Sequence, residues 1–266
     1  MSLKLRPEGL VALLTDFGLE DIYVGVMKGR ILSELPEIRP IQFIDLTHEI
    51  PPQNIRKASL KLKFSYRYFP KGTIFLVIID PGVGTERKAL VIRTEDYYFI
   101  GPDNGVFTFP IKESKELEFY EIDTIKVMRP PFSTTFHGRD LFAPAVALLL
   151  KEVPLNLWTH ELPNYKPVLL DFPEPIKTTQ GYLLSCLDVD RFGNIITNFP
   201  RTYAEGPIEV MINRKPVRLV KTYAEGKEGE IIALFSSEGY LEIAVKNASA
   251  HSLLKDPLIE VIIEQN

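Results

Sequence analysis

The sequence predicts an α/β N-terminal domain followed by an all-β, barrel-like C-terminal domain. In the first half, apolar runs typical of buried strands alternate with segments at helical spacing, which predicts βαβ crossovers and a largely parallel central sheet flanked by helices. In the last third, short β-like runs are separated by Gly, Asn and Pro, without a helical stretch. A group of prolines between the two patterns is typical of a linker. We therefore expect an α/β domain over 1–165, a linker over 166–177 and a β-barrel domain over 178–266.

Five segments give the expected N-terminal order of strand, helix, strand, helix, strand. Leu10–Leu14 is short and wholly apolar, and Thr73–Ile79 has the composition of the most buried strand. Asp21–Leu35 carries apolar residues at helical spacing and is closed by Pro36. A tight connection favours antiparallel pairing of the last two strands. The expected strands are Leu10–Leu14, Pro40–Asp45, Thr73–Ile79, Ala89–Arg93 and Tyr97–Ile100, and the expected helices are Asp21–Leu35, Ile55–Phe64 and Asp140–Lys151.

The C-terminal segment predicts several short strands and no helix. The pentapeptide Thr-Tyr-Ala-Glu-Gly occurs twice, at 202–206 and 222–226. Two copies are too few for a repeat architecture, and they indicate two similar β-turns. The expected strands are Leu183–Val189, Ile195–Thr197, Ile208–Ile212, Ile231–Phe235, Tyr240–Val245 and Leu258–Ile263.

Composition disfavours several classes of function. Hydrophobic residues make up 45% and charged residues 25%, the balance of a soluble globular protein. A net charge of −4 offers no cationic surface, so we expect no nucleic-acid partner. The longest apolar stretch, Leu141–Leu150, is too short to span a membrane, and Leu10–Leu14 is too short for a secretory signal, so we expect no membrane partner. The single cysteine, Cys186, fits a reducing compartment, and we expect a cytoplasmic protein.

Acidic residues lie at the ends of three of the expected strands: Asp16, Asp45 and Asp80. In an open α/β sheet, ligands bind beyond the carboxyl ends of the strands. A carboxylate placed there can accept paired hydrogen bonds from a ribose diol. Any one of these acids could instead be a turn or helix-capping residue. Three of them in successive strand–loop units favour a ligand site.

The loop from Asp80 to Arg87 is rich in glycine, but it lacks the third glycine of a dinucleotide motif and the Gly-Lys-Ser/Thr of a P-loop. It places an acid and an arginine where they can fold back onto each other, either as a structural ion pair or as part of a site. His137 and Gly138 precede an expected helix, which favours a histidine that faces a pocket. The four histidines form no His-x-x-x-His pair, so we expect no metal site.

A second polar motif, Asp190-Arg-Phe-Gly-Asn194, lies at a strand boundary of the C-terminal segment. It can be merely a turn. Alternatively, Phe192 can stack on a purine while Asn194 hydrogen-bonds the purine edge. The turn sequences Ser236–Tyr240 and Asn247–Ser249 allow the same two interpretations.

These motifs occur in the order of a known family. Each is weak alone, but five in register are specific, and they extend from about Leu10 to Ala250. Together they resemble the S-adenosyl-L-methionine hydroxide adenosyltransferases, relatives of the fluorinase and chlorinase enzymes. The motifs are Leu13–Gly18, Asp80–Gly84 with Arg87, His137–Asp140, Asp190–Asn194 with Thr197 and Asn198, and Ser236–Tyr240 with Asn247 and Ala248.

The resemblance implies an N-terminal α/β domain, a C-terminal β-barrel, and a homotrimer whose active sites lie between one subunit's N-terminal domain and its neighbour's C-terminal domain. It also implies the reaction of S-adenosyl-L-methionine with water to give adenosine and L-methionine, with no cofactor. The implied residue roles are ribose binding by Asp16, water activation by Asp80, Arg87 and His137, binding of the methionine end by Asp190 and Ser237, and adenine contact by Phe192, Asn194 and Ala248.

The sequence departs from the fluorinase pattern at four places. Asp80 stands where that pattern has a tyrosine, and His137-Gly138 lies where it has a Tyr-Ser pair. A carboxylate would repel a halide ion strongly in a site of low dielectric, so halogenation is disfavoured. Ser237-Glu238 replaces a Ser-Arg pair, and Gln53 replaces an aromatic residue that shields the ligand.

Two other functions stay open. The chain could be a binding protein for adenosine or S-adenosyl-L-methionine that does not turn its ligand over. It could also be a metal-assisted hydrolase that uses Asp16, Asp45, His48 and Asp80 as ligands.

Overall fold

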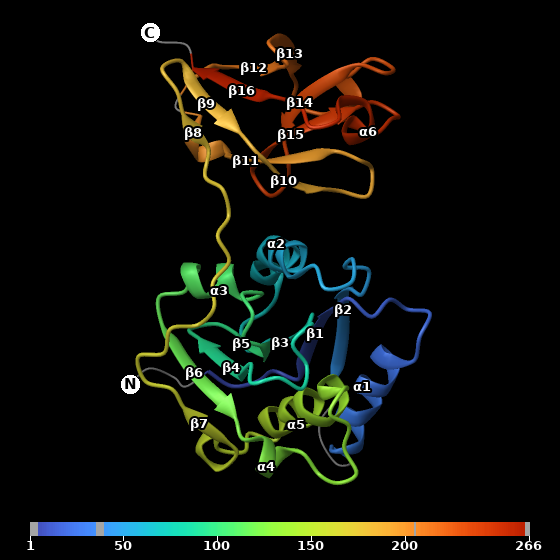
Figure 1. The fold of residues 1–266 in the computed structure, drawn as a ribbon, viewed down its shortest axis with the longest axis vertical. Coiled ribbons are helices and arrows are strands. Elements are labelled where there is room, and N and C mark those ends of the chain that lie inside the picture. The colour runs from blue at the N-terminus through green and yellow to red at the C-terminus, as the bar shows by residue number, and fades with distance from the viewer. Residues whose placement is uncertain (1–4, 36–39, 205, 264–266) are drawn as a thin grey trace. The chain divides into compact units, whose positions relative to one another are not determined.

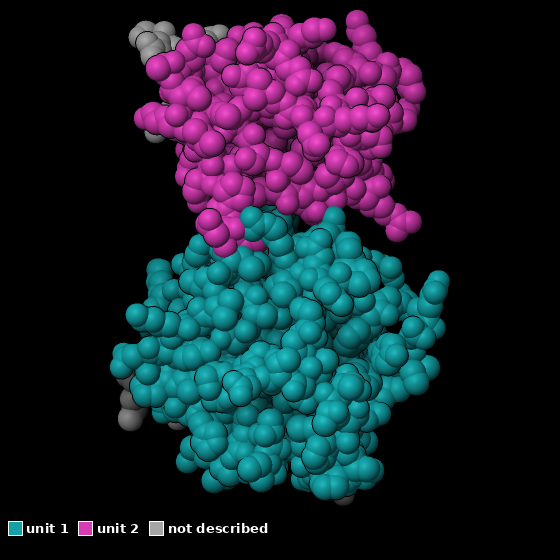
Figure 2. All heavy atoms as spheres, in the orientation of Figure 1, with its two compact units in different colours: residues 1–170 teal, residues 171–266 magenta. Residues whose placement is uncertain are grey.

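The computed structural model describes residues 5–35, 40–204 and 206–263. The chain divides between Leu170 and Asp171 into two compact units, which Figure 2 shows in different colours. We call them the N-unit and the C-unit. Within the described residues, no helix is long and apolar enough to cross a membrane. Pro36, the expected end of the first helix, lies outside the described residues.

The N-unit is built on a seven-stranded sheet with the order β2-β1-β3-β5-β4-β6-β7 (Figure 1). Neighbouring strands are parallel from β2 through β1 and β3 to β5, and antiparallel from β5 through β4 and β6 to β7. The strands are β1 (Leu10–Thr15), β2 (Gln42–Thr47), β3 (Ile74–Ile78), β4 (Ala89–Thr94), β5 (Tyr98–Pro102), β6 (Leu117–Ile122) and β7 (Thr159–Glu161).

The largely parallel sheet is therefore confirmed for four strands and wrong for the other three. The reason is the turn between β4 and β5, where the Thr94 hydroxyl accepts a hydrogen bond from the Tyr97 N–H at 2.9 Å. A connection this short can join only antiparallel strands. The strands β6 and β7 then extend the antiparallel half; neither was predicted from the sequence, because β6 is half-buried and β7 has three residues.

Helices cover both faces of this sheet. Along β1, Val11 and Leu13 face one apolar core, and Ala12 and Leu14 face the other, because successive side chains of a strand point to opposite faces. The first core is covered by α1 (Tyr23–Ser33) and α5 (Ala143–Leu150), which pack against each other, and the second by α2 (Ile55–Ser65) and α3 (Thr108–Glu113). A one-turn helix, α4 (Thr124–Val127), follows β6.

The last expected helix begins earlier than predicted and in a different geometry. A wide π-helical turn, η2 (Gly138–Phe142), leads into α5. Pro144 lies in the first turn of α5, where its missing N–H costs nothing. The prediction of one helix over Asp140–Lys151 is therefore wrong at its start. His137 occupies the N-cap position of the turn, and its side chain makes no capping hydrogen bond.

The C-unit contains a nine-stranded sheet with the order β10-β11-β15-β14-β13-β12-β16-β9-β8. All neighbouring pairs are antiparallel except β13 and β14. Leu184, Ile195, Val210, Leu241 and Val261 come from strands across the sheet yet share one core, so the sheet curls around it. The strands are β8 (Ile176–Lys177), β9 (Gly181–Leu184), β10 (Cys186–Val189), β11 (Ile195–Pro200), β12 (Ile208–Ile212), β13 (Lys215–Leu219), β14 (Ile231–Phe235), β15 (Tyr240–Val245) and β16 (Ile259–Ile263).

Two predictions for the C-unit are wrong. Leu183–Val189 is not one strand, because β9 pairs with β16 and β10 pairs with β11. Ser185 lies between the two strands, and its N–H donates to Oδ1 of Asn198 at 2.9 Å. A short helix, α6 (Ala250–Leu254), is also present, capped by Ser249, whose hydroxyl accepts from the Ser252 N–H at 3.1 Å.

The proline-rich segment is hydrogen-bonded at both of its ends. The N–H of Val168 donates to Asp103 at 3.0 Å and that of Leu170 donates to Thr108 at 2.8 Å, while β8 pairs with β9. The limits of the expected linker, 166–177, stay a prediction.

Candidate active site

The strand order places two of the predicted acids after neighbouring strands. In the order β2-β1-β3, the strands β2 and β3 lie on opposite sides of β1. The strand order therefore reverses between the carboxyl ends of β1 and β3. Thr15 at the end of β1 is paired with Ile78 at the end of β3. Asp16 and Asp80 follow these two residues, so both lie at the edge where open α/β sheets bind ligands.

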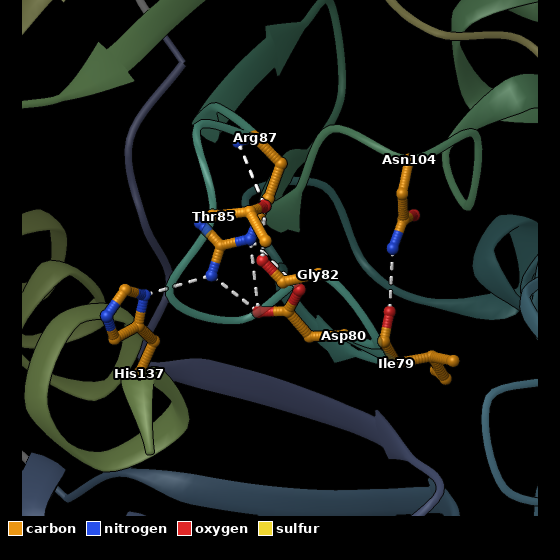
Figure 3. A network of polar contacts seen from close by, with 7 residues as sticks. All are labelled: Ile79, Asp80, Gly82, Thr85, Arg87, Asn104 and His137. Carbon is orange, nitrogen blue, oxygen red and sulfur yellow. Dashed lines mark hydrogen bonds and ion pairs between the residues drawn. The ribbon is translucent and has the colours of Figure 1, made fainter. Parts of the chain in front are cut away.

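Asp80 is held by the guanidinium of Arg87. Nε of Arg87 lies 2.9 Å from Oδ1 of Asp80, and Nη2 lies 2.5 Å from Oδ2 (Figure 3). The two side chains are only 6% and 11% exposed. A forked arginine–carboxylate pair fixes both groups in orientation as well as in charge. The predicted fold-back of this loop is therefore present.

His137 joins the same pair from a distant part of the chain. Nη2 of Arg87 lies 3.0 Å from Nδ1 of His137. Burial and the positive charge of Arg87 lower the pKa of His137 below its usual value. A neutral ring accepts a hydrogen bond at Nδ1 from the permanently charged guanidinium, which leaves its N–H at Nε2. The structure thus brings together all three residues predicted to activate water, and we call them the triad.

The loop that carries Asp80 and Arg87 is shaped by local contacts. Oγ1 of Thr85 donates to the carbonyl of Gly82 at 2.7 Å, closing the turn seen in Figure 3. Gly84 has a φ of +79°, a backbone conformation that side chains disfavour. A Cβ on Gly82 would lie 3.3 Å from Cγ of Arg87, so this glycine leaves room for the arginine stem.

Two further residues support the triad and were missed from the sequence. Nδ2 of Asn104, from the loop after β5, donates to the carbonyl of Ile79 at 2.7 Å, next to Asp80 (Figure 3). The ring of Phe142 lies 5.3 Å beneath the guanidinium of Arg87. Neither residue belongs to a recognisable motif, and only the fold brings them to the site.

One carboxylate oxygen of Asp16 accepts a hydrogen bond from the protein itself. Its Oδ2 accepts a hydrogen bond from the backbone N–H of Gln53 at 2.7 Å. Gln53 has a φ of +65°, so the backbone there is strained. Beside Asp16, the rings of Phe17, Tyr23 and Phe136 pack in an aromatic cluster with centroid distances from 5.3 to 6.0 Å. Phe136 directly precedes His137, so this cluster joins the Asp16 loop to the triad.

Asp45 and His48 form a separate structural pair. His48 is 2% exposed; its Nδ1 lies 2.7 Å from Oγ1 of Thr15 and its Nε2 lies 3.1 Å from Asp45. Asp45 also contacts Lys28 at 2.6 Å. Although burial alone would raise the pKa of Asp45, its hydrogen bonds with Lys28 and His48 lower it. Both nitrogens of His48 therefore have a polar neighbour, and no group of His, Cys, Asp and Glu within the described ranges could hold a metal ion.

Four of the five residues predicted to bind substrate from the C-unit line one cavity of about 790 Å³. Asp190 organises its rim: Oδ1 accepts from the N–H groups of Phe192 and Asn194, and Oδ2 accepts from Nδ2 of Asn194 at 2.9 Å. Asn194 is 6% exposed, whereas Phe192 is 76% exposed, an unusual position for a phenylalanine. The described lining is Asp190, Phe192, Asn194, Tyr223, Ala224, Val245, Lys246, Asn247, Ala248 and Ser249.

Ser237, the fifth residue, is not among the described residues that line this cavity. Its hydroxyl instead donates to Oε1 of Glu238 at 2.7 Å. Tyr223 and Ala224 line the cavity and were missed. They belong to the second copy of the repeated pentapeptide, whose sequence predicted only a turn.

Both units of the chain match domains of one known protein family. Residues 11–158 match the SAM hydroxide adenosyltransferase N-terminal domain, and residues 185–257 match the C-terminal domain of the same family. The chain is 37% identical to the (R)-S-adenosyl-L-methionine hydrolase of Thermus thermophilus, over 94% of this chain and 96% of that protein. It is 36% identical to the hydrolase of the same name from Methanocaldococcus jannaschii, over 95% and 94%.

A fluorinase and two solved structures are also similar to this chain. The fluorinase of an Actinoplanes species is 26% identical over 90% of this chain and 91% of its own length. A crystal structure of a conserved protein from Thermotoga maritima superposes with a TM-score of 0.83 at 36% identity, covering 95% of this chain and 99% of that one. The crystal structure of a conserved protein from Thermus thermophilus gives a TM-score of 0.75 at 34% identity, covering 97% and 100%. The chain therefore belongs to the SAM hydroxide adenosyltransferase family.

Proposed function

We propose that this protein hydrolyses S-adenosyl-L-methionine to adenosine and L-methionine by in-line attack of an activated water on ribose C5′. The observation that carries this proposal is the triad of Asp80, Arg87 and His137 at the carboxyl edge of β1 and β3. The relatives that are 30–37% identical over most of the chain are named hydrolases of this substrate.

The reaction needs activation of the nucleophile and not of the leaving group. A bond forms between the water oxygen and C5′ while the C5′–S bond breaks, and its electron pair neutralises the sulfonium. Methionine therefore leaves as a neutral thioether without a general acid. Water is a poor nucleophile, since its pKa is about 15.7. The protein must hold one water opposite the sulfur and stabilise the charge that develops as the water loses its proton.

The triad residues have the properties for this task. We assign Asp80 to orient the water and accept its proton, as a positioned carboxylate can. Arg87 fixes Asp80 through the fork, and His137 offers its remaining N–H to the water or to the substrate. Holding the water in line also removes an entropic barrier, by up to about 7–11 kcal/mol in well-oriented reactions.

The other predicted site residues are assigned to parts of the substrate. We assign Asp16 to the ribose hydroxyls, Phe192, Asn194 and Ala248 to adenine, and Asp190 to the methionine end, with Ser237 as a second contact at that end.

We further propose that the chain forms a homotrimer, with each site completed by a neighbouring subunit's C-unit, as its resemblance to the family implies. No cofactor enters this scheme. The cytoplasmic location stays a prediction.

The competing functions are less well supported. Asp45 and His48, two of the four proposed metal ligands, lie 3.1 Å from each other and already contact Lys28 and Thr15. A halogenase would have to bind a halide ion beside the carboxylate of Asp80, which repels it. A binding protein without turnover is disfavoured because the relatives that are 36–37% identical over most of the chain are named hydrolases.

Product analysis in isotopically labelled water tests the proposed function. The protein is incubated with S-adenosyl-L-methionine and a chelator in H₂¹⁸O, and adenosine and methionine are measured by mass spectrometry. We expect equal amounts of both, with one ¹⁸O in the 5′-hydroxyl of adenosine. Bound but unchanged substrate would identify a binding protein, and loss of turnover with the chelator would identify a metal-dependent enzyme.

A further inference from the structure

A buried acid lies behind one wall of the C-unit cavity. Glu242 is in the middle of β15, between Ile196 of β11 and Leu234 of β14, and is only 3% exposed. Carboxylic residues are rarely buried on a central strand, because removing them from water is costly without a partner. A carboxyl group buried in this way needs a hydrogen-bond partner within the protein.

The partner of Glu242 is a residue that lines the cavity. The hydroxyl of Tyr223 donates a hydrogen bond to Oε1 of Glu242 at 2.6 Å. Tyr223 is 48% exposed, so its ring lies at the cavity wall while its hydroxyl reaches the protein interior. An exposed aromatic ring that is tethered at its far end keeps one orientation, because the bond removes its rotational freedom.

The backbone that carries Tyr223 is also fixed. Tyr223 begins a short 3₁₀ turn with a capping box, in which Thr222 and Glu225 bond each other's backbone groups. Nη2 of Arg218 donates to the carbonyl of Glu225 at 2.6 Å, and Nζ of Lys246 donates to that of Gly226 at 2.8 Å. With the backbone held in this way, the hydrogen bond to Glu242 determines where the ring points.

Glu242 does not need a negative charge to accept the hydrogen bond from Tyr223. Burial, together with the negative charges of Asp190 and Glu238, raises the pKa of Glu242. A neutral side chain of the same shape can accept the same hydrogen bond from Tyr223. Glutamine at this position would therefore preserve the tether, and leucine would remove it.

We propose that Glu242 is a positioning residue. Its hydrogen bond fixes the ring of Tyr223, and this ring forms one wall of the cavity that binds the adenine of the substrate. The proposal rests on the proposed function for the identity of the ligand. It assigns Glu242 to binding of the nucleoside and not to the chemical step, so it affects adenosine and S-adenosyl-L-methionine alike.

The test compares Glu242→Leu, Glu242→Gln and Tyr223→Phe for steady-state kinetics and for adenosine binding by calorimetry. We expect Glu242→Leu and Tyr223→Phe to raise KM about 10-fold, to weaken adenosine binding by the same factor and to leave kcat within about 2-fold. Glu242→Gln should match wild type in all three. The double variant Tyr223→Phe/Glu242→Leu should be no worse than either single variant, because both remove the same bond.

The matched control is Tyr203→Phe, which breaks a tyrosine–glutamate contact with Glu174 outside the cavity and should change neither constant. If Glu242→Leu does not fold, Tyr223→Phe, which keeps the ring, carries the test. Unchanged KM in Tyr223→Phe would overturn the proposal. So would a Glu242→Gln variant that loses affinity for S-adenosyl-L-methionine but not for adenosine, since Glu242 would then act through its charge. Wild-type turnover, measured separately, reports on the proposed function.

Discussion

Arg87 contacts Asp80 and His137 through the same nitrogen: Nη2 lies 2.5 Å from Oδ2 of the acid and 3.0 Å from Nδ1 of the ring. Asp80 and His137 are far apart in the sequence, so the arginine is the element that links the loop after β3 to the turn before α5. Because the guanidinium presents several donors in a rigid plane, it can serve both partners at once.

Arg87→Lys tests this double role. A lysine keeps the positive charge but cannot form the fork to Asp80 while also reaching His137. We expect kcat to fall by at least about 10-fold with little change in KM, since the water would be less well oriented. Adenosine release measures the effect. Arg93→Lys, which alters an ion pair with Glu118 elsewhere in the same sheet, is the control and should keep full kcat; equal activity of the two variants would remove Arg87 from the mechanism.

The protonation of His137 gives a pH prediction. Burial and Arg87 lower its pKa in the folded protein, so the unfolded chain binds this proton more strongly. The associated stability is fully present above the unfolded pKa of about 6.5 and is lost as the pH falls below it through the folded value. Protonation also removes the acceptor for Arg87, and we expect activity to fall over the same acidic range.

An NMR titration of His137 measures this directly, with the resonance assigned by its absence in His137→Asn. We expect a pKa below 6.5 in the wild type and a higher value in Arg87→Gln, where the neighbouring charge is gone. A wild-type value at or above 6.5 would contradict the arrangement of the triad.

Phe192→Ala tests the adenine contact in the C-unit. The ring is 76% exposed, so its removal should leave Tm unchanged. Loss of base stacking costs about 1–3 kcal/mol, and we expect KM to rise by about 5- to 160-fold. Ile176→Ala, which truncates a side chain 59% exposed in β8 of the same unit, is the matched control and should keep the wild-type KM. A Phe192→Ala enzyme with the same KM as this control would show that adenine binds elsewhere.

Halide ions give a fourth prediction. If Asp80 holds the attacking water as we propose, its carboxylate repels a halide ion at that position, so fluoride or chloride should not replace water. We expect adenosine as the only nucleoside product when either salt is present, by liquid chromatography with authentic standards. Accumulation of a 5′-halogenated nucleoside would show that Asp80 does not control the nucleophile.

Much of the N-unit was predictable because its buried strands are continuous apolar runs. β1 and β3 were located to within one or two residues, and their register then placed Asp16 and Asp80 at one edge. The antiparallel strands β6 and β7 were missed, since a half-buried strand and a three-residue strand carry weak patterns.

The triad was predictable from motif order, but its supporting residues were not. Asn104 and Phe142 reach the site only through long-range packing, and no local spacing marks them. Glu242 was missed for a related reason. In the sequence it is one acid in an alternating strand, and only the structure shows that the turn carrying Tyr223 covers it.

The most direct test of the central claim is the kcat of Asp80→Asn. Asparagine preserves the shape of the side chain but accepts no proton, so we expect kcat to fall by about 10²- to 10⁴-fold with KM within about 3-fold of wild type. Asp45→Asn, within the neighbouring strand β2, should retain kcat within about 3-fold. An Asp80→Asn enzyme that binds substrate and keeps near-full kcat would contradict the assignment of Asp80 as the group that activates water.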